Sequence, residues 1–265
     1  MRKFIISVLI LMLCGITAYE IQYIRWKHFW SPANRQPYYV IHQTKSDTLR
    51  VLMIGDSWAE MHSVFQMDSF LQSKLVYCLN RPVKVFSKGI GGEKSKGIYM
   101  SMFENGESGT KPLLSLGCDY CVILAGINDA ANNLGTEQFC QNYHLILDFL
   151  FKNEIQPVVI EIPDVDIWNV YGGKPKKDLL NDFLRSIMTH CGMYNYSEYR
   201  EALHTMLQKD NIMHKVIYVP MNCWNGRQAL INKSLFLKDG VHLNKLGYEK
   251  LDSCIALHIS QDFAR

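Results

Sequence analysis

The sequence lacks several features that would point directly to a function. It has no block of basic residues interleaved with aromatic ones, and its formal net charge is only +3, so no nucleic-acid partner is expected. It has no internal repeat and no low-complexity tract, which argues against solenoid and fibrous architectures. It does have 265 residues, of which 48% are hydrophobic. That is enough for one good-sized core with a short appendage.

Cysteine patterns that would define a zinc site are also missing. Cys118 and Cys121 form a Cys-x-x-Cys pair, but the chain has no second pair, and this one leads into an apolar segment. Of the eight cysteines, Cys14 lies in an apolar N-terminal run, which leaves seven, an odd number that cannot all pair within the molecule. We therefore expect Cys118 and Cys121 to be buried core residues.

The N-terminus contains the one long apolar run. Arg2 and Lys3 precede sixteen residues, from Phe4 to Tyr19, which would rise about 24 Å as a helix, a little less than a bilayer core of roughly 30 Å. This pattern fits a signal peptide cut after Ala18 or an uncleaved anchor. We favour the anchor, because residues 19–39 are rich in aromatics with basic residues among them, as at membrane interfaces. A buried N-terminal helix is the third interpretation.

The chain is therefore expected to have three parts. Residues 1–19 would be a signal peptide or N-terminal membrane anchor, and residues 20–48 a juxtamembrane linker, with Pro32, Pro37 and a polar stretch near its end. Residues 49–265 would form the folded domain. We expect this domain to lie outside the cytoplasm, on the periplasmic or cell-envelope side, either secreted or membrane-anchored.

Short apolar segments alternate with helical ones after residue 48. Strands are expected at 51–54, 83–87, 120–125, 157–162 and 215–219, and helices at 58–79, 136–153, 177–190, 197–209 and 246–259. This alternation predicts a five-stranded parallel sheet with helices on both faces, a three-layer α/β/α sandwich. In such sheets, ligands bind beyond the carboxyl ends of the strands. Ser57 lies just past the end of the first strand, and Asp56 before it is expected to cap the following helix.

A serine hydroxyl becomes a nucleophile only when a base takes its proton and a third group orients the base. Among nine histidines, His242 fits best, because Asp239 lies three residues before it on a turn that contains Gly240. The alternative for Asp239 and His242 is a solvated turn ahead of a helix. Glu201 and His204 form a rival pair, but they fall within a predicted helix, where they would make an exposed contact.

Acyl transfer also needs hydrogen-bond donors aimed at the developing oxyanion. Gly91 and Gly92 follow the second strand, where glycine lets a backbone N–H approach a ligand closely. Asn128 follows the third strand, where its side-chain amide could donate. Both sequences are also common in ordinary turns. They stand out because they end successive strands of one predicted sheet.

Four blocks of the chain, spread from residue 55 to residue 242, together resemble the SGNH (GDSL) hydrolase family and appear in the order of that family. They are Gly55-Asp56-Ser57, Gly92 within Lys88–Glu93, Gly126-x-Asn128-Asp129 and Asp239-x-x-His242. The resemblance implies the flavodoxin-like fold of that family for residues 49–265. It also implies that no cofactor and no metal ion is needed.

The same resemblance implies a role for each matching residue. Ser57 would be the nucleophile, His242 the base, and Asp239 the residue that orients the base. The N–H groups of Ser57 and Gly92 and the side chain of Asn128 would form the oxyanion hole.

The sequence departs from the pattern of the family at two positions. Ser87 stands where the second block usually opens with asparagine, and Trp58 replaces an aliphatic residue after the serine. Both changes would alter the pocket without removing a catalytic group. The Gly-x-Ser-x-Gly motif of α/β-hydrolases is not matched, because Ala59 occupies its last position.

The leading hypothesis is a serine esterase that hydrolyses small acyl esters, with O-acetyl groups on glycans as the expected substrates. An O-acyltransferase on a cell-envelope glycan would use the same residues. A non-catalytic, membrane-tethered glycan-binding protein is the alternative from another class. Trp168 and Tyr171 could contact the substrate or fill the core of their own loop, and Arg227 could bind an acidic substrate or be solvated.

Overall fold

The computed structural model describes residues 2–42, 46–166, 173–225 and 232–264. The chain divides into two compact units, Met1–Pro32 and Ala33–Arg265. The division into parts over 1–19, 20–48 and 49–265 remains a prediction.

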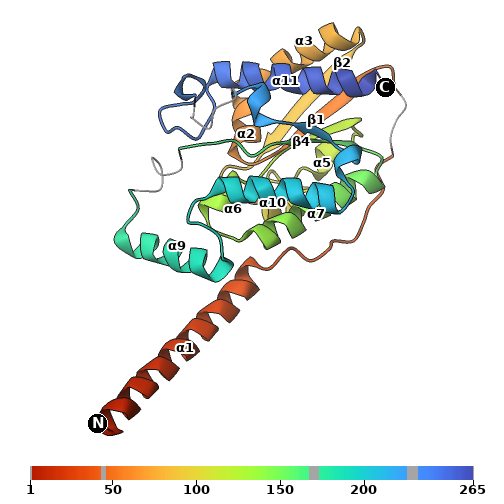
Figure 1. Ribbon diagram of the computed structural model, residues 1–265. Coiled ribbons are helices and arrows are strands. Elements are labelled where there is room, and N and C mark those ends of the chain that lie inside the picture. Colours follow the sequence, from red (N-terminus) through yellow and green to blue (C-terminus); the bar gives the residue numbers. More distant parts are fainter. Residues whose placement is uncertain (1, 43–45, 167–172, 226–231, 265) are drawn as a thin grey trace. The chain divides into compact units, whose positions relative to one another are not determined.

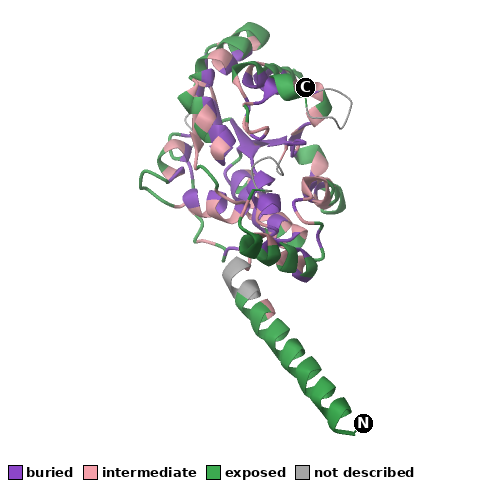
Figure 2. Cartoon of the chain, turned by 90° about the vertical axis from the view of Figure 1, so that its left-hand side faces the viewer, coloured by how far each residue is buried: buried purple, intermediate pink, exposed green. Residues whose placement is uncertain are grey.

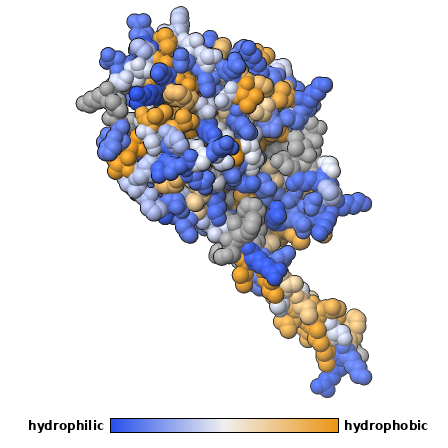
Figure 3. All heavy atoms as spheres, turned by 180° about the vertical axis from the view of Figure 1, so that it is seen from behind, coloured by the Kyte–Doolittle hydropathy of each residue, from blue (hydrophilic) through white to orange (hydrophobic). Residues whose placement is uncertain are grey.

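The first unit is a single helix, α1 (Arg2–Trp30). Its segment Arg2–Arg25 comprises 24 residues and is long and apolar enough to cross a membrane. These residues rise about 36 Å, more than a bilayer core of roughly 30 Å. The apolar side chains are exposed along α1 (Figures 2 and 3). A signal sequence and a membrane anchor both meet this description.

The second unit contains the predicted five-stranded parallel sheet. Its strands are β1 (Leu49–Gly55), β2 (Val83–Gly89), β3 (Tyr120–Leu124), β4 (Gln156–Ile160) and β5 (Ile217–Val219). They follow the order β2-β1-β3-β4-β5, and all neighbours are parallel. Gly55, at the end of β1, pairs with both Gly89 and Leu124. The carboxyl ends of three adjacent strands therefore meet at one edge of the sheet.

Helices cover both faces of the sheet, which confirms the three-layer α/β/α architecture (Figure 1). One face carries α2 (Ser57–Val64), α3 (Met67–Leu79) and α11 (Lys245–Phe263), and the other carries α4 (Ser95–Ser101), α6 (Ile127–Ala131), α7 (Thr136–Lys152) and α10 (Tyr196–Lys209). The remaining elements are α5 (Lys111–Leu114), α9 (Lys176–Thr189), η1 (Met213–Lys215), η2 (Met221–Cys223) and η3 (Lys233–Leu235). The inner strands β1, β3 and β4 are almost completely buried, which explains their largely apolar sequences, whereas the edge strand β2 is partly exposed and carries Lys84 and Lys88.

The predicted helix over 58–79 is wrong in one respect, because the structure breaks it into α2 and α3. The break falls at Gln66, whose φ of 58° lies in the left-handed region. This stretch contains neither glycine nor proline, so no local sequence signal marks the break. The turn brings Asp68, in the first turn of α3, back to the side chain of His62 on α2.

A strap over residues 33–41 lies along α7. The backbone N–H of Ala33 donates to Asn142 Oδ1 (2.8 Å), and that of Ile41 donates to Asn153 Oδ1 (2.7 Å). Both Ala33 and Ile41 are buried. The folded unit therefore begins at Ala33, immediately after the first unit ends at Pro32.

The cysteines fall into two groups. Cys223, after β5, forms a disulfide with Cys254 on α11. Cys118 and Cys121 are buried, as predicted. Burial raises the pKa of the Cys118 thiol to about 12, which keeps it protonated and unreactive.

Candidate active site

Ser57 is the first residue of α2, immediately beyond the carboxyl end of β1. Asp56 caps this helix as predicted, because its Oδ1 accepts a hydrogen bond from the N–H of Trp58 at 2.9 Å. Glycine at position 89 allows β2 to approach α2 closely, since a Cβ there would lie 2.1 Å from the Glu60 nitrogen. The serine is thus held by a short, tightly packed strand-to-helix junction.

His242 lies on the loop before α11, and Asp239 orients it. One oxygen of Asp239 accepts the N–H groups of Val241 and His242, each at 2.9 Å. The other lies 2.7 Å from His242 Nδ1. His242 Nε2 in turn lies 3.0 Å from Ser57 Oγ. The structure therefore brings together the serine, histidine and aspartate that were predicted across 185 positions of sequence.

The charge of Asp239 follows from these contacts. Partial burial alone would raise its pKa, but the hydrogen bonds from His242 and Val241 outweigh this effect. The pKa of the Asp239 carboxyl therefore lies below its usual value. Asp239 is a carboxylate at neutral pH and favours an imidazole that carries its proton on Nδ1.

Gly92 and Asn128 meet through the residues beside them. The Asn128 amide donates to the backbone oxygen of Glu93 (3.0 Å) and to Asp56 Oδ2 (3.3 Å). It therefore links the neighbour of Gly92 to the neighbour of Ser57. Gly92 has a φ of 74°, and no atom lies within 4 Å of the position a Cβ would take. This left-handed conformation favours glycine and leaves open space beside the backbone.

Two buried carboxyl groups support this edge of the sheet. Burial raises the pKa of Asp56 to about 7, although the N–H of Trp58 and the Asn128 amide oppose the shift. Burial raises the pKa of Asp129 to about 6. Asp129 accepts the Ser95 N–H at 3.0 Å and the Ser95 hydroxyl at 2.6 Å, which fixes the start of α4.

Trp58 connects the serine helix to the histidine loop, a role that sequence reasoning missed. Its indole Nε1–H donates to the backbone oxygen of Val241 at 3.1 Å, and its own carbonyl accepts the Tyr248 hydroxyl at 2.8 Å. The ring is buried against Trp224 and Phe236. The only sequence signal was the replacement of an aliphatic residue by tryptophan.

A second buried polar cluster surrounds His62, which is fully buried in α2. Its Nε2 lies 3.0 Å from Asp252 Oδ1 on α11, and its Nδ1 lies 3.0 Å from Asp68 Oδ1 on α3. Ser87 Oγ lies 2.8 Å from the same Nδ1 and also bonds to Asp68. Because both ring nitrogens of His62 face carboxylates, neither can accept a proton from Ser87. The cluster shares the residue types of a triad but is built to hold an imidazolium.

The pKa of His62 agrees with this geometry. Burial alone would lower it, but hydrogen bonds and charges from Asp252 and Asp68 raise it to about 9. The protonated ring therefore ties α2 to both α3 and α11. Ser87, the departure from the family pattern, was the only hint of this cluster in the sequence.

Other predicted candidates lie elsewhere. His204, on α10, packs its ring edge-on against Tyr218 of β5. Glu201, on the same helix, lines a surface groove. Trp168, Tyr171 and Arg227 lie outside the described residues. In the parts of the chain that the structure describes, no group of three or more His, Cys, Asp or Glu side chains is placed to hold a metal ion. The prediction that no cofactor is needed remains a prediction.

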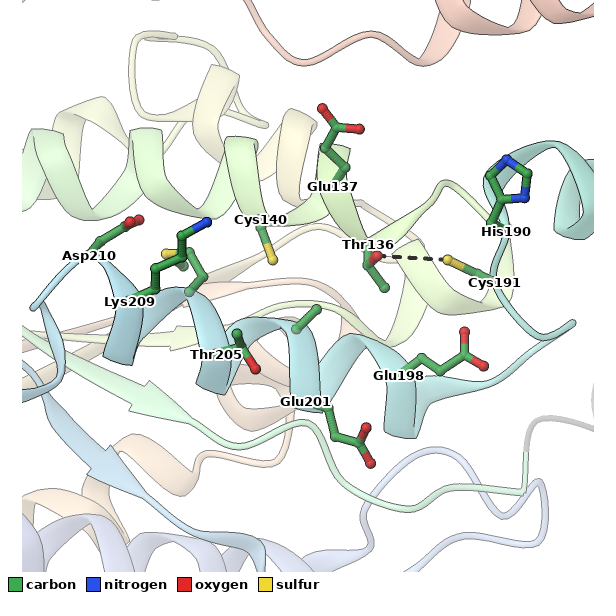
Figure 4. A pocket seen from close by; sticks show the side chains of 12 residues that line it. Thr136, Glu137, Cys140, His190, Cys191, Glu198, Glu201, Thr205, Lys209 and Asp210 are labelled. Carbon is green, nitrogen blue, oxygen red and sulfur yellow. Dashed lines mark hydrogen bonds between the residues drawn. The ribbon is translucent and has the colours of Figure 1, made fainter.

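The groove that Glu201 lines runs between α7 and α10, is open to solvent and has a volume of about 560 Å³ (Figure 4). Figure 4 also shows Thr136, the first residue of α7, turned toward Cys191, with Oγ1 and Sγ 3.8 Å apart. The N-cap position of α7 belongs to Gly135. None of the five predicted site residues lines this groove, which is separate from the Ser57 site.

The fold and the arrangement at its edge are those of an α/β/α acyl hydrolase. The family model described as GDSL-like Lipase/Acylhydrolase matches residues 53–250, and the chain belongs to this family. The resemblance read from the four sequence blocks is thereby confirmed, and the protein is an enzyme of the acylhydrolase class. No curated protein matches the sequence.

Several solved structures share the fold. The lipase/acylhydrolase from Enterococcus faecalis is 17% identical with a TM-score of 0.58, covering 81% of this chain and 96% of that one. A GDSL-like lipase from Bacteroides thetaiotaomicron is 16% identical with a TM-score of 0.54, and the match covers 91% of this chain and 98% of that one. A variant of an acetyl-xylooligosaccharide esterase from Geobacillus Stearmophilus is 14% identical with a TM-score of 0.54, and the match covers 80% of this chain and 94% of that one. At these identities the likeness establishes the fold alone.

Proposed function

We propose that the protein is a serine esterase in which Ser57, His242 and Asp239 act as a catalytic triad. The observation that carries this proposal is the 3.0 Å distance between Ser57 Oγ and His242 Nε2, with Asp239 2.7 Å from the other ring nitrogen. A nucleophile within hydrogen-bond reach of a base, and a third group orienting that base, is the arrangement that activates a serine.

The reaction would proceed in two steps. Ser57 Oγ attacks the carbonyl carbon of the ester, and its proton passes to His242 Nε2. The bond between the acyl carbon and the alcohol oxygen then breaks, and His242 gives the proton to the departing alcohol. His242 next takes a proton from water, whose oxygen attacks the acyl carbon, and the proton returns to Ser57 as the acid leaves. Asp239 stays ionised and stabilises the imidazolium.

The oxyanion of each tetrahedral intermediate would be held by the N–H groups of Ser57 and Gly92 and by the Asn128 amide. The bonds from Asn128 to the neighbours of Ser57 and Gly92 support this assignment. Both amide hydrogens already have acceptors. To donate to the oxyanion, Asn128 would exchange its longer bond, the one of 3.3 Å to Asp56.

The substrates that we propose are small acyl esters, with O-acetyl groups on glycans as the leading class. One similar structure is named as an acetyl-xylooligosaccharide esterase, which supports this choice by fold analogy only. We place the enzyme outside the cytoplasm, with α1 as its membrane anchor. The Cys223–Cys254 disulfide supports this location, because disulfides persist in oxidising compartments.

The test uses the full chain in detergent micelles and follows hydrolysis of p-nitrophenyl acetate. Ser57→Ala, His242→Ala and Asp239→Asn should each lower kcat/KM by about a hundredfold or more. His144→Ala removes a half-exposed histidine on α7 and should leave the rate unchanged. Equal slow rates in all five proteins would reject an activated serine.

The same proteins separate the alternatives. A fluorophosphonate probe should label the wild type and not Ser57→Ala, because labelling requires an activated serine. Absence of labelling would favour the glycan-binding alternative. If an added acceptor sugar becomes acylated in preference to water, the enzyme is an acyltransferase that uses the same residues.

A further inference from the structure

Helix α9 carries four large apolar side chains on the side that faces solvent. Leu180, Phe183, Leu184 and Ile187 are 56%, 52%, 45% and 47% exposed. Their spacing of three, one and three residues places them on one helical face. In an ordinary surface helix this face would be buried against the core. Here the apolar stripe is on the outside.

The opposite side of α9 is polar and is held inward. Asp182 is 3% exposed, accepts a hydrogen bond from the Tyr194 hydroxyl, and lies 2.8 Å from Lys174 Nζ. Arg185 NH1 lies 3.4 Å from the other oxygen of Asp182. Turning α9 to bury its apolar stripe would expose this network and leave Tyr194 without the carboxylate. The contacts of Asp182 therefore fix α9 with its apolar stripe facing outward.

The end of α9 lies close to the point where the folded unit begins. A Cβ on Gly135 would lie 3.3 Å from Thr189, the last residue of α9, and Thr136 contacts Cys191 just beyond it (Figure 4). Asn142, which binds Ala33, is six residues further along α7, or about 9 Å. Figure 1 shows the strap and α9 on the same side of the unit.

The length of the tether limits how far this side can be from a membrane. The segment of α1 that is long enough to cross a membrane ends at Arg25, and the folded unit begins at Ala33, eight residues later (33 − 25). Eight residues reach at most about 28 Å when fully extended. If α1 crosses a bilayer, the bilayer surface must lie within that distance of Ala33. The surface nearest to Ala33 is then within reach of lipid.

We propose that the apolar stripe of α9 rests in the interfacial layer of the bilayer that holds α1. The four side chains would enter the boundary between headgroups and acyl chains, as in helices that lie in the membrane plane. Lys176 and Lys177 are exposed in the first turn of α9 and would face lipid phosphates, while Asp178 favours the helix N-terminus. A bilayer thus matches both the apolar stripe and its basic end.

This contact would also orient the active site. Upstream of α9, the backbone N–H of Asp166 donates to the backbone oxygen of Gly240, the residue after Asp239, at 2.9 Å. The C-terminal end of α9 contacts the start of α7. Both points belong to the edge of the sheet that carries Ser57. The site would therefore face the membrane and receive esters presented at its surface. This last step rests on the proposed function, whereas the α9 contact itself does not.

The test places the photoreactive residue p-benzoylphenylalanine at Phe183 in the full chain, reconstituted into phosphatidylcholine vesicles with or without phosphatidylglycerol. Irradiation should attach phospholipid at position 183 several-fold more than at Tyr77. Tyr77 is a suitable control because it is an 88% exposed aromatic residue on α3, on the other face of the sheet. Phosphatidylglycerol should raise the yield at position 183.

A paired substitution gives the second measurement. Leu180→Ser with Ile187→Ser should reduce the lipid adduct at position 183 several-fold, while Val76→Ser with Leu257→Ser, at comparably exposed sites, should not. Equal lipid yields at 183 and 77, no lipid adduct, or a cross-link only to a second copy of the chain would overturn the proposal. Alkaline extraction reports separately whether α1 is inserted, and p-nitrophenyl acetate hydrolysis reports separately on the Ser57 site.

Discussion

The indole nitrogen of Trp58 lies 3.1 Å from the backbone oxygen of Val241. One partner follows Ser57 directly in the chain, and the other directly precedes His242. A single hydrogen bond between buried groups therefore couples the position of the serine helix to that of the histidine loop. Because Ser57 Oγ and His242 Nε2 are only 3.0 Å apart, small movements of either segment would break their contact.

The first prediction concerns this bond. Trp58→Phe keeps an aromatic ring but leaves the Val241 oxygen without its donor, and an unpaired buried group costs about 1 to 3 kcal/mol. We expect kcat for p-nitrophenyl acetate to fall by about tenfold to a hundredfold, with little change in KM, since misplacement of reacting groups by an ångström has effects of that size.

Trp224→Phe is the matched control. Trp224 is also buried and contacts the Trp58 ring, but within the described residues its indole nitrogen has no hydrogen-bond partner. Its replacement should leave kcat nearly unchanged. If both variants lose the same activity, ring packing and not the bond to Val241 positions the site.

The second prediction concerns the Asn128 amide. Asn128→Ala should lower kcat by about a hundredfold to a thousandfold, which is typical for the loss of one oxyanion donor. KM should change little, because the donor acts mainly on the transition state. Steady-state kinetics would measure both constants, with Asn105→Ala at an exposed asparagine as the control. A rise in KM at unchanged kcat would assign Asn128 to substrate binding.

The third prediction concerns pH and His62. The pKa of His62 is raised from 6.5 to about 9 in the folded protein, so the folded state binds its proton more tightly than the unfolded state. The resulting stabilisation is fully present below about pH 6.5 and is lost as the pH rises through about 9. Over this window the free energy of unfolding should fall by up to about 3 kcal/mol.

Urea unfolding of the full chain in micelles between about pH 6.5 and pH 9.5 would measure this effect. His62→Gln should be less stable at the lower pH and should remove most of the pH dependence. His144→Gln, at a half-exposed histidine, should retain it. An unchanged slope in His62→Gln would mean that other groups cause the pH dependence.

The parts of the fold that were predicted correctly depend on local sequence. β1 was recognisable because a buried parallel strand needs a continuous apolar run, and Gly55 marks where it stops. The serine, the Asp56 cap and the Asp239–His242 turn were also readable, because each involves partners only a few residues apart. The order of the strands then implied that the separate motifs meet at one edge.

The features that were missed depend on distant partners. Asp252 lies 190 positions after His62, and Val241 lies 183 positions after Trp58. No periodicity within α2 could reveal that its histidine is charged or that its tryptophan donates to a loop near the C-terminus. The break at Gln66 was missed for a related reason, because no glycine marks it. The turn is accompanied instead by a side-chain contact between Asp68 and His62.

The last prediction concerns the disulfide between Cys223 and Cys254, which the odd number of cysteines left undetermined. The bridge closes a loop of 31 residues, so in the chain-entropy account it stabilises the fold by about 3 to 4 kcal/mol. Cys254→Ser should lower the free energy of unfolding by about that amount. Cys78→Ser removes an exposed free thiol and should have almost no effect.

Because the bridge fastens the loop after β5 to α11, whose first turn follows the His242 loop, the Cys254 variant should also lose activity at a lower temperature. If all eight thiols react with an alkylating agent before reduction, the bridge is not formed, and the support that it gives to an oxidising compartment disappears.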